Sequence, residues 1–147
     1  MPVPSRLVVD ANILVAAFLK DSTARRILTL SLIEFSAPAL LFEELERHLP
    51  SLRERAGLSA RQSSELFRLL TGYVTTIAED SLQPFWDEAN EAMEGIDLRD
   101  AAYVAAALAI PCEGIWSDDL HLKAQGAVPC FTTRELVSML RDEGLRF

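Results

Sequence analysis

Six of the 22 acidic residues in this chain stand at four places, each beside an apolar run or at a turn. They are Asp10, Glu44, the pair Asp97 and Asp100, and the pair Asp118 and Asp119. Carboxylates that gather at one point repel one another, so a cluster of them persists mainly where it holds a cation. Oxygen ligands without Cys or His suit a hard divalent ion. We therefore predict that these acids form a site for Mg²⁺ or Mn²⁺.

Other chemistries leave no comparable pattern in the sequence. His48 and His121 stand in no H-x-x-x-H arrangement and the two cysteines form no C-x-x-C pair, so the sequence disfavours a zinc site. The six glycines form neither a dinucleotide-binding nor a phosphate-binding loop. No G-x-S-x-G marks a nucleophilic serine. A phosphatase of the haloacid dehalogenase type would carry an Asp where Asn12 stands.

Strands that alternate with helices would bring these acids together. We expect strands at 6–10, 34–37, 73–77, 110–116 and 128–131. We expect helices at 13–20, 23–32, 39–49, 59–70, 81–94 and 98–110, and a C-terminal helix capped by Thr132 or Thr133. This alternation indicates an α/β fold with a parallel sheet. Ligands of such sheets bind beyond the carboxyl ends of the strands, which is where Asp10 and the turn at 117–119 would lie.

Each acid also has a purely structural explanation when it is taken alone. Asp10 can cap the helix that follows it, and Asp97 can cap the apolar helix after it. Glu44 can pair with a basic residue one helical turn further along, and residues 118–119 can simply form a turn. The structural explanations become less convincing when the acids are considered together. Asp97 and Asp100 would share one face at the start of a helix that is otherwise apolar, and such a helix is held in the interior of the protein.

The amino-acid composition limits the classes of protein to which this chain can belong. The chain has 147 residues, of which 50% are hydrophobic and 24% charged, so we expect one globular domain spanning 1–147. The formal net charge of −8 argues against binding of nucleic acid through a broad basic surface. The longest nearly apolar stretch, 101–112, is shorter than the roughly 20 residues that span a membrane. No secretory signal is visible, and we expect a cytoplasmic protein with both cysteines reduced.

Four segments, in order, resemble the motifs of the PIN domain family, which includes the VapC-type toxins of toxin–antitoxin pairs. Residues 8–14 are similar to its apolar strand followed by D-x-N, and 97–109 to its acid-led apolar helix. In 37–45 the acid that precedes Leu matches, which selects Glu44 over Glu43. In 115–119 a Ser stands where Thr is commoner, and the Asp two places on selects Asp119 over its neighbour.

The resemblance implies a three-layer α/β/α sandwich with a mainly parallel sheet, and Mg²⁺- or Mn²⁺-dependent hydrolysis of RNA phosphodiester bonds. Its catalytic metal ligands would be Asp10, Glu44, Asp100 and Asp119. Groups that orient or supplement them would be Asn12, Ser117, Asp97 and Asp118. Basic residues that would contact the RNA backbone are Arg25, Arg26 and Lys123. The resemblance also implies a homodimer and, for the toxin branch, inhibition by a small antitoxin protein.

Two other functions fit a fold of this kind. One is a module that binds RNA or a protein partner without cutting, against which the retained acids argue. The other is a DNA-directed nuclease of the flap-processing type, which usually carries more acids and a helical arch. So short a chain leaves no room for that arch.

Overall fold

A five-stranded parallel sheet runs through the middle of the molecule. The computed structural model describes residues 2–20 and 22–146. In chain order the strands are β1 (Arg6–Val9), β2 (Glu34–Pro38), β3 (Val74–Ile77), β4 (Gly114–Trp116) and β5 (Cys130–Phe131). Their order in the sheet is β3-β2-β1-β4-β5, and every neighbouring pair is parallel. The predicted parallel α/β fold is therefore confirmed.

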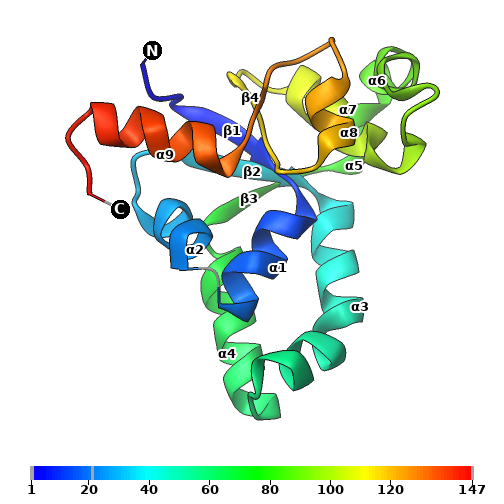
Figure 1. The fold of residues 1–147 in the computed structure, drawn as a ribbon. Coiled ribbons are helices and arrows are strands. Elements are labelled where there is room, and N and C mark those ends of the chain that lie inside the picture. Colours follow the sequence, from blue (N-terminus) through cyan, green and yellow to red (C-terminus); the bar gives the residue numbers. More distant parts are fainter. Residues whose placement is uncertain (1, 21, 147) are drawn as a thin grey trace.

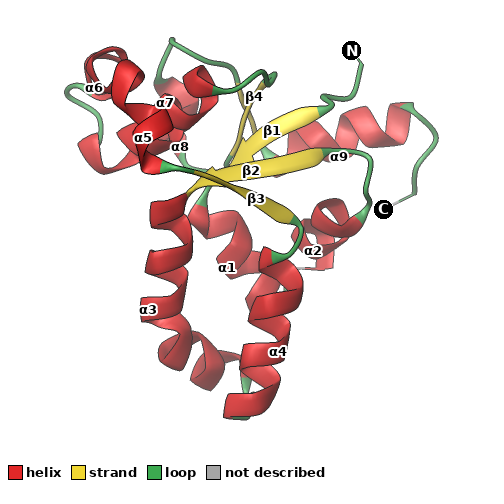
Figure 2. Ribbon diagram, turned by 180° about the vertical axis from the view of Figure 1, so that it is seen from behind, coloured by secondary structure: helices red, strands yellow, loops and turns green. Residues whose placement is uncertain are grey.

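Helices cover both faces of this sheet. The α-helices are α1 (Ala11–Leu19), α2 (Ser22–Thr29), α3 (Ala39–Ala56), α4 (Ala60–Thr71), α5 (Glu79–Leu82), α6 (Trp86–Met93), α7 (Ala101–Ala109), α8 (Leu120–Ala124) and α9 (Thr133–Asp142). Two short 3₁₀ turns, η1 (Gln83–Phe85) and η2 (Leu98–Asp100), precede α6 and α7. Helices α1–α4 lie on one side of the sheet and α5–α7 on the other (Figures 1 and 2).

The core includes β1 and α7, two largely apolar elements of the chain. Leu7, Val8 and Val9 are fully buried, as the continuous apolar run predicted. Residues 101–107 of α7 are buried as well, and five of these seven are alanines, whose small side chains let the helix lie close to the strands. The helix that follows Asp100 is therefore fixed in place by packing.

Several helices differ from those expected. Helix α3 continues through Pro50 to Ala56, and ends at Gly57 in the left-handed conformation (φ 69°). The helix expected at 81–94 is divided into α5, η1 and α6, and Pro84, which lacks an N–H for the helical ladder, lies at the break. Helix α8 was not expected at all.

The residues that cap helix starts were predicted more accurately than the helix lengths. The cap expected at Ser59 forms a complete capping box with Gln62. Of the two residues considered for the C-terminal helix, Thr132 rather than Thr133 is the cap, and it forms a capping box with Glu135. Both cysteines are free thiols. Among the described residues, no helix has the length and apolar character needed to cross a membrane.

Candidate metal centre

A cavity of about 240 Å³ lies beyond the carboxyl ends of β1 and β4. It is lined by Asp10, Ala11, Asn12, Glu44, Asp97, Arg99, Asp100, Tyr103 and Asp119. The four carboxylates singled out in the sequence therefore come together from four elements. Asp10 follows β1, Glu44 lies on α3, Asp100 ends η2 and Asp119 caps α8.

Asp10 is both a helix cap and a wall of this cavity. Its side chain is only 3% exposed. One carboxylate oxygen accepts a hydrogen bond from the Ile13 N–H (3.0 Å), and the other accepts from the Ser117 hydroxyl. The oxygen of Ser117 in turn accepts from the Asp119 N–H (3.0 Å). One buried hydroxyl thus joins two of the four carboxylate residues.

The carboxylates oppose one another's ionisation. Burial raises the pKa of Asp10 to about 6, and the nearby charges of Asp119 and Asp100 add to the effect, while its hydrogen bonds oppose it. Burial likewise raises the pKa of Asp100 to about 6, together with the charges of Asp119 and Asp97. A cation would relieve this repulsion, so the electrostatics agree with a cluster built for positive charge.

Two buried oxygens in the cavity lack a well-formed hydrogen bond. In the described part of the chain, Asp100 Oδ2 and the Tyr103 hydroxyl are the buried side-chain oxygens without a well-formed hydrogen bond, although the Ala11 main chain also interacts with the phenol. An unpaired buried polar group costs about 1–3 kcal/mol. Burial, with the charges of Glu44 and Asp10, also raises the pKa of the Tyr103 phenol well above its usual range. An open carboxylate oxygen among hard oxygen donors fits a divalent cation such as Mg²⁺ or Mn²⁺.

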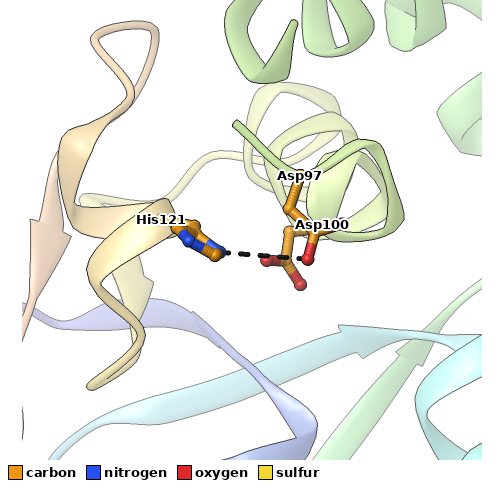
Figure 3. A group of neighbouring side chains, drawn as sticks. All are labelled: Asp97, Asp100 and His121. Carbon is orange, nitrogen blue, oxygen red and sulfur yellow. Dashed lines mark ion pairs between the residues drawn. The ribbon is translucent and has the colours of Figure 1, made fainter. Parts of the chain in front are cut away.

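Asp97 and His121 extend the cluster on one side (Figure 3). The Asp97 side chain caps η2 by accepting from the Arg99 N–H (3.0 Å), which is the capping role considered for it. The Arg99 guanidinium donates to both Asp97 oxygens (3.1 and 3.0 Å) and holds the pKa of Asp97 below its usual value. The potential ligand atoms of Asp97, Asp100 and His121 all lie within 4.8 Å of one another.

Sequence reasoning missed three residues at this site. Arg99 and Tyr103 line the cavity, and His121 lies beside it. Their positions in the sequence carried a signal: Tyr103 stands three residues after Asp100, and His121 two after Asp119. Residues three apart share a helix face, so Tyr103 could have been assigned to the cavity with Asp100.

Asp118 does not join the cluster. Its two oxygens accept from the Thr133 N–H and hydroxyl, each at 2.7 Å, so it fixes the start of α9 instead. Asp118 therefore lies outside the set of residues that line the cavity. Adjacent residues in an extended turn point in opposite directions, and only Asp119 turns inward. Asn12 lines the cavity with an exposed side chain.

The basic residues expected to contact RNA are engaged elsewhere. Arg25 donates to two carbonyls at the end of α1 (2.8 and 3.2 Å). Arg26 donates to a carbonyl near the C-terminus (2.6 Å). Lys123 pairs with Glu135 at 2.5 Å. The basic residue that lines the cavity is Arg99, whose side chain is 90% exposed.

Comparison with known proteins agrees with this fold. Residues 8–141 match the model of the PIN domain family. The fold is similar to a solved structure described as a toxin–antitoxin complex from Klebsiella pneumoniae, with a TM-score of 0.63 and 16% identity over 86% of this chain and 97% of that one. No curated protein is significantly similar in sequence. Because the family match spans most of its length, the chain belongs to the PIN domain family.

Proposed function

We propose that this chain is a divalent-metal-dependent endoribonuclease that acts as the toxin of a toxin–antitoxin pair. The observation that carries the proposal is the cavity that gathers Asp10, Glu44, Asp100 and Asp119, in which a buried Asp100 oxygen has no partner. The membership of the PIN domain family supports it. Hydrolysis of a phosphodiester needs positive charge beside the phosphate, and this cavity is built to hold such charge.

Asp10, Asp100 and Asp119 would hold one or two ions, with Glu44 binding directly or through water. When bound, Mg²⁺ or Mn²⁺ supplies Lewis acidity toward the phosphate and toward an attacking water. The protein itself holds the carboxylate side chains in fixed positions. Asp10 is fixed by a helix N–H and by Ser117, and Asp119 accepts from the His121 N–H (2.7 Å). Carboxylates fixed in this way do not need to reorganise when the charge on the phosphate grows.

Charge also governs how RNA would reach the site. A phosphate is repelled by four carboxylates, and the chain carries a formal net charge of −8. RNA should therefore bind weakly without divalent cations. Arg99 lies at the cavity with an exposed guanidinium; its Nε and Nη2 donate to Asp97, which leaves the N–H groups of Nη1 to contact a phosphate oxygen. We assign Arg99 that contact in place of the basic residues suggested by the sequence.

An antitoxin and a second copy of the chain are the proposed protein partners. The similar structure is described as a toxin–antitoxin complex, which motivates the first. An acidic cavity attracts cationic side chains, so an antitoxin segment would inhibit by inserting Arg or Lys into it. Co-purification with the product of the adjacent reading frame tests this. A complex that leaves the cavity open would contradict the inserted-cation model.

Cleavage assays test the proposed activity directly. Full-length protein is incubated with a structured RNA, single-stranded DNA and flapped DNA, in Mg²⁺, Mn²⁺ or EDTA. We expect RNA cleavage with either metal, none in EDTA, and none for Glu44→Gln. Glu43→Gln is the matched control, because Glu43 is the exposed neighbour of Glu44 outside the cavity. Binding of RNA without cleavage would identify a silent module, and preferential cleavage of flapped DNA would assign a different nuclease class.

A further inference from the structure

We infer that the exposed face of α3 beyond Glu44 is a track for the RNA backbone, on which Arg47 and Arg55 bind phosphates to one side of the cleaved bond. This inference rests on the proposed function, from which it takes RNA as the ligand. The two arginines lie outside the cavity and differ from the basic residues that the sequence suggested for RNA contact.

Helix α3 connects the cavity to the outer end of the molecule. It begins at Ala39, directly after β2, and its Glu44 lines the cavity. From there α3 runs away from the sheet and forms a hairpin with α4 (Figures 1 and 2). At a rise of about 1.5 Å per residue, Arg47 lies about 5 Å beyond Glu44 along the helix and Arg55 about 16 Å beyond it. The second distance is an upper value, because Pro50 can bend the axis between them.

The exposed residues that share the face of Glu44 are polar and carry no negative charge. Residues three or four apart lie on one face of a helix, so Arg47 and His48 follow Glu44 directly. Ser51 continues this face, and Arg55 follows Glu44 by about three turns. All four residues are exposed, and we call them the α3 track: Arg47, His48, Ser51 and Arg55. Long side chains on a helix lean toward its N-terminus, which is the cavity end of α3.

The acidic residues of α3 other than Glu44 lie on a different side of the helix. At about 100° per residue, Glu43 and Glu54 are turned by about 80–100° from Glu44, and Glu46 by about 160°. Within residues 2–20 and 22–146, no charged side chain of α3 forms an ion pair. The guanidinium groups of the α3 track are therefore not neutralised by carboxylates, and they can bind an anion.

Phosphate contacts on the α3 track would offset the negative charge of the cavity. The chain has a formal net charge of −8, so the RNA backbone is repelled by most of the protein. A guanidinium stays charged at neutral pH, and its paired N–H groups match the oxygens of a phosphate. The His48 ring and the Ser51 hydroxyl add hydrogen-bond donors. Contacts of these kinds position the backbone and carry no base specificity.

An acidic protein segment is the other kind of ligand that a basic helix face attracts. RNA is favoured here because the α3 track begins one helical turn from Glu44, in line with the cavity proposed to cut the strand. A stacked strand advances about 3.4 Å per nucleotide, so the distance from Glu44 to Arg55 corresponds to about five nucleotides. An RNA bound in the cavity is therefore expected to reach both arginines.

The salt dependence of RNA binding tests the α3 track without any cleavage. A labelled single-stranded RNA of about 12 nucleotides, within the usual range of site sizes, is titrated by fluorescence anisotropy at a fixed Mg²⁺ concentration. The intact chain carries Glu44→Gln in every sample, so that the RNA stays uncut. Adding Arg47→Gln and Arg55→Gln should reduce the slope of log K against log salt by about 1.4, which is about 0.7 for each lost phosphate contact. The loss of affinity should therefore shrink about 25-fold between about 50 and 500 mM salt.

The matched control is Arg61→Gln with Arg68→Gln, which removes the same charge from α4. Both arginines are exposed and lie on the other helix of the hairpin. Arg61 pairs with Glu65 on the surface, so its replacement should hardly affect stability. The control should change the salt slope by less than about 0.5. Thermal melts check that both double variants remain folded.

Steady-state cleavage with Glu44 intact provides a second readout. Arg47→Gln with Arg55→Gln should raise KM for the same RNA at least about tenfold and change kcat less than about twofold, because these residues bind the strand away from the reacting phosphate. A merely structural role would instead lower the melting temperature and kcat together.

The outcomes separate this inference from the proposed function. Equal salt slopes for the two double variants would overturn the α3 track, because only net charge would then matter. Normal RNA binding by the track variant, with lost binding of the product of the adjacent reading frame, would also overturn it and assign the face to a protein. If the wild type cleaves RNA while the track variant binds it normally, the track fails and the nuclease proposal stands. If the wild type binds RNA through the track but cleaves none, the track stands and the nuclease proposal fails.

Discussion

Replacing Asp10 by Asn should stabilise the metal-free protein at neutral pH. Folding raises the pKa of Asp10 from its ordinary 3.8 to about 6. A carboxyl whose pKa is raised in the folded state contributes stability fully below its unfolded pKa and loses it as the pH climbs through the folded pKa. At about 1.4 kcal/mol per pKa unit, the ionised Asp10 costs the fold up to about 3 kcal/mol above pH 7.

The Asn side chain can keep the two contacts that Asp10 makes. Its carbonyl oxygen can accept from the Ile13 N–H, and its amide can donate to the Ser117 oxygen. The variant should therefore gain up to about 3 kcal/mol over the wild type at pH 8, and almost nothing near pH 4. A chain of this size melts about 2–4 °C higher for each kcal/mol, so the expected rise is about 6–12 °C.

Thermal melts in EDTA between pH 4 and 8 measure this difference. Glu43→Gln, which removes an exposed charge on α3, is the control and should melt like the wild type. Added Mg²⁺ should raise the melting temperature of the wild type more than that of Asp10→Asn, because the cation binds the folded state. If Asp10→Asn melts below the wild type at pH 8, or if the difference does not shrink toward pH 4, the burial of an ionised Asp10 is not the dominant cost at this site.

Three further changes probe the cavity. Asp100→Asn should abolish RNA cleavage in a gel assay without lowering the melting temperature in EDTA; a clear loss there would mark Asp100 as a structural residue. Ser117→Ala should lower the free energy of unfolding in urea by about 1–3 kcal/mol, because the Asp119 N–H loses its acceptor and Asp10 a donor; an unchanged urea midpoint would contradict this. Tyr103→Phe removes a hydroxyl that lacks a well-formed hydrogen bond, so calorimetry should find the metal-free variant at least as stable as the wild type; destabilisation beyond about 1 kcal/mol would reveal a partner for that hydroxyl.

Much of the fold follows from local patterns in the sequence. The apolar run at 6–10 predicted a buried strand, and a parallel arrangement follows from helices between strands. Capping residues marked the starts of α4 and α9 because the signal lies within four residues. The helix expected at 39–49 was too short, because α3 continues through Pro50 to Ala56: a proline in a helix weakens it without always ending it.

The candidate site could be predicted only in part, because the direction of a side chain depends on contacts between segments that are far apart in the sequence. Acids at strand ends are visible in the sequence, and four of them do line one cavity. The inward direction of Asp119 and the outward direction of Asp118 depend on where α8 begins, which the sequence did not reveal. Likewise, the Lys123 contact with Glu135 depends on the packing of α8 beside β5 and α9, so no local pattern could exclude it from RNA binding.

The hydrogen bond between Ser117 and Asp10 has a consequence for the order of events during protein synthesis. The two residues are separated by 107 positions, so they meet only when β4 has joined β1 in the sheet. A nascent chain that lacks β4 carries Asp10 and Glu44 but cannot assemble the cavity. Contacts across so long a stretch of chain also form slowly, because loop closure precedes any gain from them. The four carboxylates that line the cavity therefore come together only after β4 and the turn that carries Asp119 have emerged from the ribosome.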